Sequence, residues 1–145
     1  ELSCLVGVYE YFMNLFEHHY PGENPSIREK IHKVNELIAE HEKEIANPLL
    51  DYLTNRSDIK LIGKKTITDK DRAPTIAFTM NNKSSKELSS ELVKHGIATR
   101  NDNFYAWRCL MALGIDVEDG VVRTSMVHYN SLEDVEKLIN ALKKI

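Results

Sequence analysis

Residues 120–130 read GVVRTSMVHYN, and this stretch decides the fold class. The run from Val121 to Val127 is rich in β-branched and apolar residues, and the Asp-Gly pair before it is a turn signal, so we expect a strand here. After it, Ser131 with Asp134 resembles the capping box of a helix. The segment therefore predicts a strand that leads into a final amphipathic helix.

Working outward, three shorter runs also have the composition and length of strands, at 59–62, 75–80 and 97–100. Helical periodicity surrounds them. It predicts one helix ending before Pro21, then a long helix that is capped by Asn24, has Pro25 in its first turn and runs to about Leu53. Shorter helices are predicted at 84–95, 105–113 and 131–142. The expected fold class is α+β: a small, mostly antiparallel sheet covered by helices on one side and preceded by a long helix.

The length of 145 residues fits a single domain, 1–145. Within it we expect a helical linker region at 1–56 and an α+β sheet layer at 57–145. The chain begins inside an apolar helical pattern without an initiating methionine, which indicates a fragment of a longer protein.

Composition and spacing argue against several classes of function. The formal net charge is −3, which provides no broad positive field for nucleic acid. Cys4 and Cys109 are too few for a disulfide framework, so a reducing cytoplasmic compartment is expected. No apolar run approaches the roughly 20 residues of a membrane span. The six histidines show no metal-binding spacing, and no metal site is expected.

Two arginines are the candidate binding residues. Arg123 lies inside the expected strand 121–127, where its side chain must either reach solvent or pair with an anion, because an unpaired buried guanidinium is costly. Its two parallel donors suit a carboxylate. Arg100 ends a neighbouring expected strand and is a candidate for the same pocket. Solvent-facing arginines on a sheet surface remain an alternative interpretation for both.

Four segments resemble the C-terminal domain of class V aminotransferases, in the branch of cysteine desulfurase-like enzymes. They are APTIAFTM at 73–80, SSKEL at 84–88, HGIATRNDNFYAWRCLMALGI at 95–115 and GVVRTSMVHYNSLEDVEKLINAL at 120–142. The resemblance implies an intact enzyme that depends on pyridoxal 5'-phosphate (PLP), acts on an amino acid as its small-molecule substrate and is a homodimer. It also implies that PLP is bound mainly by a preceding large domain, so no cofactor and no activity are expected of this fragment alone.

Carried over residue by residue, the resemblance implies that Arg123 binds the substrate α-carboxylate and that Arg100 is a second pocket residue. No catalytic residue is assigned within this chain. Desulfurases of the nearest type carry a nucleophilic cysteine where this chain has Tyr105. Cys109, one helical turn further, is expected to face the core. A phenol does not replace a thiolate as the nucleophile that attacks sulfur, so the departure argues against desulfurization.

Two other hypotheses stay open from the residues alone. The chain could be a stand-alone α+β module that binds a small anion through Arg123 and Arg100. It could instead be an interaction protein that works through the apolar seam of the long helix between Ile27 and Leu49.

Overall fold

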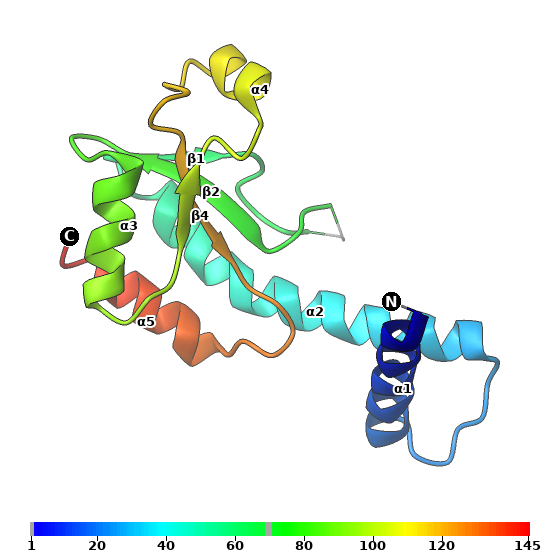
Figure 1. Cartoon of the computed structure of the whole chain (residues 1–145). Coiled ribbons are helices and arrows are strands. Elements are labelled where there is room, and N and C mark those ends of the chain that lie inside the picture. The colour runs from blue at the N-terminus through cyan, green and yellow to red at the C-terminus, as the bar shows by residue number, and fades with distance from the viewer. Residues whose placement is uncertain (1, 69–70) are drawn as a thin grey trace. The chain divides into compact units, whose positions relative to one another are not determined.

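The computed structural model describes residues 2–68 and 71–145 (Figure 1). The chain divides into two compact units, Glu1–His41 and Glu42–Ile145. In chain order the elements are α1 (Leu2–His19), α2 (Ile27–Thr54), β1 (Ile59–Ile62), β2 (Thr75–Met80), α3 (Ser85–Lys94), β3 (Arg100–Asp102), α4 (Trp107–Ala112), β4 (Val121–Ser125) and α5 (Leu132–Leu142).

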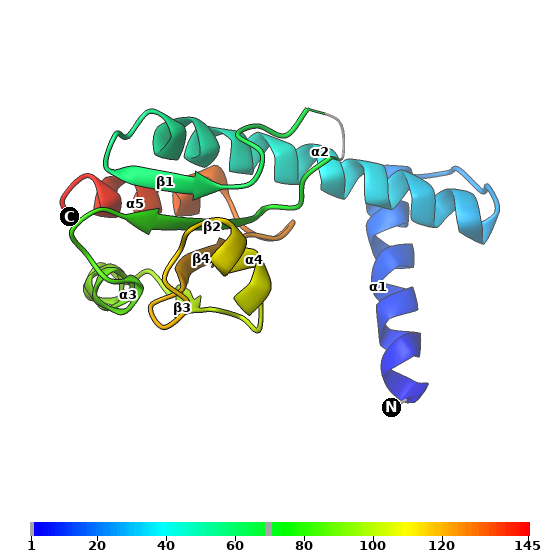
Figure 2. The same cartoon turned by 90° about the horizontal axis from the view of Figure 1, so that it is seen from above.

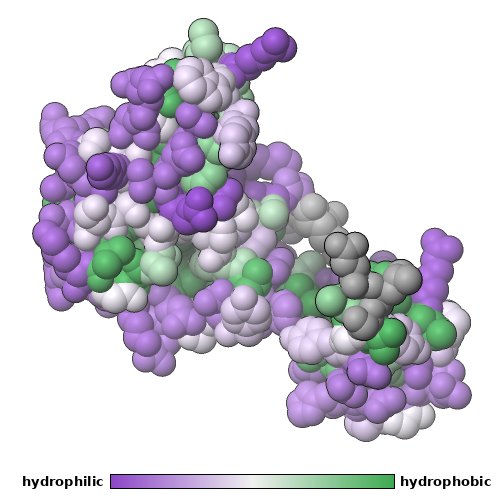
Figure 3. Space-filling view, in the orientation of Figure 1, coloured by the Kyte–Doolittle hydropathy of each residue, from purple (hydrophilic) through white to green (hydrophobic). Residues whose placement is uncertain are grey.

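The first unit contains α1 and the first part of α2. Phe16 and Val34 are its fully buried side chains. The Phe16 ring stacks on Tyr20 with 5.2 Å between centroids, and the ammonium of Lys30 lies 5.1 Å from the Phe16 centroid. The N-terminal part of α1 remains uncovered, with Leu5 64% exposed, and hydrophobic side chains are visible there at the lower right of Figure 3.

Helix α2 begins two residues later than predicted. Ser26, not Asn24, caps it: the Glu29 carboxylate accepts hydrogen bonds from the Ser26 backbone N–H (2.9 Å) and hydroxyl (2.6 Å). The Ser26 hydroxyl also accepts a hydrogen bond from the backbone N–H of Glu29 at 3.4 Å, so the two residues cap the helix reciprocally. Pro25 therefore precedes the helix instead of occupying its first turn.

The second unit is built on a four-stranded sheet in the order β1-β2-β4-β3, and all three pairings are antiparallel. One face packs against α2, α3 and α5. Its core combines β2 and β4 side chains with those of the three helices, among them Ile76, Phe78, Val122, Leu49, Leu53, Leu88, Leu92, Val135 and Leu142. The predicted α+β class with an antiparallel sheet and a helical layer is confirmed.

The burial of side chains alternates along the strands, so the sheet has a core face and an opposite face. In β2, Ile76, Phe78 and Met80 are buried in the core while the residues between them are less buried. The short helix α4 lies on the other side of the strands from α5 (Figures 1 and 2). Lys60, which points to that side, donates a hydrogen bond from Nζ to the carbonyl oxygen of Leu113 at 2.7 Å.

Two strands differ from the prediction at their ends. β3 covers Arg100–Asp102 instead of 97–100, because the side chain of Ile97 packs against the core before pairing with β4 begins. β4 ends at Ser125, since the backbone N–H groups beyond it find partners outside the sheet. That of Met126 donates to the Pro74 carbonyl, and that of Val127 to the side chain of Asn130.

Candidate functional site

The two predicted arginines face each other across neighbouring strands. Arg100 of β3 is paired with Arg123 of β4, and Ala77 of β2 is the partner of Arg123 on its other side. Cross-strand partners share a face of the sheet, so both guanidinium groups arise from the face opposite the core formed by Ile76 and Val122. Like charges directly opposite each other are unfavourable. The pair is therefore the place on this face where an anion would relieve repulsion.

A cavity of about 260 Å³ adjoins the pair. Its lining consists of Ala98, Thr99, Arg100, Arg123 and Ser125, which include neither a carboxylate nor a lysine. Its charged groups are thus both cationic. The Ser125 hydroxyl supplies a neutral donor or acceptor, while the Thr99 hydroxyl is hydrogen-bonded to that of Ser89 at 2.9 Å. The lining suits a small anion with hydrogen-bonding capacity, such as a carboxylate.

Arg123 is half buried and is oriented by an aromatic ring. Its guanidinium carbon lies 4.1 Å from the centroid of the Phe104 ring, which is close stacking for a cation on an aromatic face. Its Nε is buried and has no hydrogen-bond partner among the residues that the structure describes. Arg100, by contrast, is exposed. The site therefore has one stacked arginine and one free to reorient.

The ring that stacks on Arg123 comes from an unusual turn. Phe104 and Tyr105 both have positive φ angles, 51° and 59°, which bulky residues rarely adopt. The Asn103 side chain holds the turn: its oxygen accepts from the Tyr105 backbone N–H at 3.0 Å, and its amide donates to the Val117 carbonyl at 3.2 Å. This turn delays α4, which starts at Trp107 instead of the predicted Tyr105.

Phe104 is not among the site residues that the sequence predicts: Phe104, Tyr105 and Trp107 could line a pocket, but aromatic residues at helical spacing are more often core. The polar stretch before Phe104 indicates a turn. Two consecutive left-handed residues without glycine leave no sequence signature. Asn103 is the one signal that could have pointed to the turn, since asparagine side chains commonly hold such turns.

Tyr105 and Cys109 complete this region. Tyr105 projects into solvent with 98% of its surface exposed. The prediction that Cys109 faces the core is wrong: it is exposed, and Leu110 is the buried residue of α4. A six-residue helix buries only a narrow stripe, and in α4 Leu110 lies on it while Cys109 does not.

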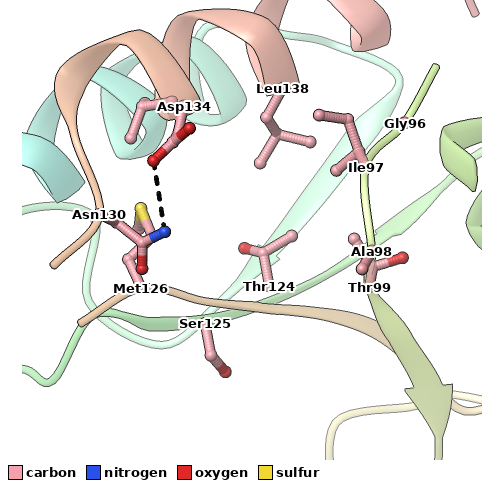
Figure 4. A pocket seen from close by; sticks show the side chains of 11 residues that line it. Gly96, Ile97, Ala98, Thr99, Thr124, Ser125, Met126, Asn130, Asp134 and Leu138 are labelled. Atoms are coloured by element: carbon pink, nitrogen blue, oxygen red, sulfur yellow. Dashed lines mark hydrogen bonds between the residues drawn. The ribbon is translucent and has the colours of Figure 1, made fainter.

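A second cavity, also of about 260 Å³, opens beside residues 96–99, which lead into β3, and the end of β4 (Figure 4). It shares Ala98, Thr99 and Ser125 with the arginine cavity. In Figure 4 the Ser125 side chain points away from Leu138 and Asp134, which line the second cavity. Hydrogen bonds from the Ser131 backbone and then from the Asn130 side chain lower the pKa of Asp134. That carboxylate is committed to capping α5.

Known proteins resemble this chain in both sequence and structure. The sequence profile of the aminotransferase class-V family matches residues 30–138. The chain belongs to the class-V aminotransferase family. This class-V chain is 38% identical over 130 residues to aminotransferase-like protein FGM3 of Gibberella zeae, covering 87% of the chain and 30% of that protein. It is 30% identical over 112 residues to probable cysteine desulfurase 1 of Mycobacterium leprae, covering 74% and 16%.

Solved structures agree on the fold of the class-V chain. The apo cysteine desulfurase from Thermococcus onnurineus aligns with a TM-score of 0.66 at 22% identity, over 81% of this chain and 29% of that one. A NifS-like protein from Rickettsia africae aligns with a TM-score of 0.63 at 19% identity, over 79% and 30%. The chain thus spans less than a third of each of these relatives and structures.

The family is PLP-dependent, so the lining of the arginine cavity can be compared with the groups that a PLP site requires. A PLP site requires a lysine for the covalent linkage and an acidic partner for the ring nitrogen. The five lining residues supply neither. The cavity by itself does not fit the cofactor.

The structure also bears on metal binding and on membrane insertion. Within 2–68 and 71–145, no group of three or more histidine, cysteine or acidic side chains is arranged to hold a metal ion. In the same ranges no helix has both the length and the apolar character to cross a membrane.

Proposed function

We propose that this chain belongs to a PLP-dependent class-V enzyme that acts on an amino acid, and that Arg123 binds the α-carboxylate of the substrate. Arg100 is the second pocket residue. The observation that carries the proposal is the direct pairing of the two arginines beside a cavity whose charged lining groups are both cationic. A guanidinium offers two parallel donors to a carboxylate, and the second positive charge strengthens the attraction.

In this proposal residues 1–145 are the C-terminal small domain, with a helical linker region at 1–56 and the sheet layer at 57–145. The chain spans less than a third of the length of its relatives, which supports this assignment. PLP supplies the electron sink of the reaction and is held mainly by residues outside this chain. This chain orients the substrate. Alone, it should neither bind PLP tightly nor turn over amino acids, and a lysine-linked PLP adduct trapped on it by borohydride would contradict this.

The proposed reaction is not desulfurization. Tyr105 stands at the place where the resemblance expects the nucleophilic cysteine, and its phenol cannot form the sulfur–sulfur bond that a thiolate forms. Cys109 is exposed on α4, one turn beyond that place. Release of sulfide from cysteine by the intact protein, lost on Cys109→Ser, would overturn this part of the proposal.

For the intact enzyme we also propose a cytoplasmic location and a homodimer. The few free cysteines and the family support these proposals. Sedimentation of the intact protein tests the dimer.

The experiment that tests the main proposal is the visible absorbance of protein expressed from the complete natural reading frame, with and without added amino acids. A PLP band that one amino acid shifts would support the proposal and identify the substrate class. A folded, full-length protein without such a band would contradict it.

A second candidate function is a small-anion-binding module without catalysis. The observation that favours it is that both arginines and the whole lining of their cavity lie within this chain. Saturable binding of a carboxylate by a full-length protein that lacks PLP would select this alternative.

A further inference from the structure

An arginine that binds a carboxylate must be held in place while its positive charge stays uncompensated and its N–H donors stay available. A neighbouring aspartate or glutamate would orient it, but would also occupy its donors and compete with the incoming anion. Among the described residues, no ion pair or hydrogen bond is made by the Arg123 guanidinium, and its buried Nε has no partner. Asp102 is the carboxylate on the same face of β3, and its Oδ1 accepts from the backbone N–H of Asn103 at 2.7 Å.

The contact that Arg123 does make is with the Phe104 ring, 4.1 Å from its guanidinium carbon. An aromatic face attracts the cation and fixes its plane, yet leaves the N–H groups at its edge free. Stacking therefore orients the guanidinium while preserving its charge and its donors.

The position of Phe104 is itself determined by the fold. Its left-handed backbone, with φ of 51°, is maintained by the side chain of Asn103, which bridges the Tyr105 N–H and the Val117 carbonyl. Gly120 passes so close that a Cβ there would lie 2.3 Å from the Asp102 carbonyl. A strained conformation held by its surroundings is typical of functional sites.

From this geometry we infer that Phe104 is a positioning residue: its ring holds the Arg123 guanidinium in the orientation that receives the substrate carboxylate. The inference rests on the proposed function of Arg123. It adds a residue that makes no direct contact with the substrate and acts through the arginine.

The test uses three variants of the 145-residue chain. Phe104→Leu and Phe104→Asn remove the ring, and asparagine also tolerates the left-handed backbone, so at least one ring-free variant should fold. Phe104→Tyr keeps the ring and is the matched control. The first readout is the NMR signal of Arg123 Nε–H, assigned with Arg123→Lys. The second is the dissociation constant for L-alanine, measured by NMR titration.

We expect the Arg123 Nε–H signal of the parent chain and of Phe104→Tyr to be shifted upfield by the ring. Both ring-free variants should lose that shift and bind L-alanine roughly tenfold more weakly, as the usual strength of cation–π contacts implies. Absence of the shift in the parent chain would overturn the inference. So would equal L-alanine affinity in the parent and the ring-free variants.

The same data separate this inference from the proposed function. If the parent chain shows the ring shift but binds no L-alanine, the positioning role fails, while the carboxylate role of Arg123 is decided by the absorbance titration of the intact, PLP-bearing protein. If the parent binds L-alanine and loss of the ring leaves affinity unchanged, only the positioning role fails.

Discussion

Replacing Gly120 with alanine should destabilise the second unit far more than its backbone angle alone explains. Gly120 has a φ of +73°, a left-handed value that costs alanine about 1–2 kcal/mol. In addition, the new Cβ would lie 2.3 Å from the carbonyl carbon and oxygen of Asp102 and 2.7 Å from the Asn103 nitrogen. These are backbone atoms of the turn that carries Phe104, so relief requires the turn to move. Such overpacking typically costs a further 1–3 kcal/mol.

Gly96 is the matched control, because it has the same φ of +73° and no atom within 4 Å of the place where an alanine methyl group would lie. Gly96→Ala should lower the free energy of unfolding by about 1–2 kcal/mol, and Gly120→Ala by about 2–5 kcal/mol. Guanidinium unfolding followed by circular dichroism measures both. Equal destabilisation by the two substitutions would refute the close approach of residue 120 to the turn.

Three other outcomes are expected. Arg56→Lys should lower the free energy of unfolding by about 1 kcal/mol in urea titration, because lysine cannot reproduce the paired hydrogen bonds to Asp58 at 2.7 and 2.5 Å; no loss would contradict their contribution. Asn103→Ala should cost about 1–2 kcal/mol through two lost hydrogen bonds, and a neutral result in thermal unfolding would show that the turn does not need them. Hydrogen bonds at the helix caps lower the pKa of Glu87 and Asp134, so the unfolded chain takes up their protons first as pH falls. The stabilisation of the folded chain by these two carboxylates should be complete above the ordinary carboxyl pKa values and disappear as pH drops below about 4. An acid unfolding profile that is unchanged in Asp134→Asn would argue against this contribution.

The periodic and turn signals of the sequence predicted most of the second unit correctly. β1 and β2 have the expected bounds, and the Ser131–Asp134 capping box is present. These elements follow from local chemistry: alternating burial within a strand, and side chains that satisfy the first N–H groups of a helix. Their agreement with the structure reflects short-range forces that a single sequence displays directly.

What local chemistry could not predict lies around the arginine cavity. The register that pairs Arg100 with Arg123 depends on contacts between strands that are separated along the chain by a helix and its flanking loops. The apolar residue Ile97 suggested a strand, although it packs on the core before pairing begins. The stacking of Phe104 on Arg123 depends on two left-handed residues and on the close passage of Gly120. Tertiary packing, not propensity, determines these features.

The central claim, that Arg123 binds the substrate carboxylate, is tested most directly in the intact, PLP-bearing protein. The measurement is the concentration of the reactive amino acid that half-saturates the shift in visible absorbance, compared between the parent, Arg123→Lys and the control Arg108→Lys, which changes an exposed arginine of α4. Lysine keeps the charge but loses the paired donors, so Arg123→Lys should require roughly ten- to a hundredfold more amino acid while Arg108→Lys matches the parent. Equal half-saturation in all three proteins would contradict the claim.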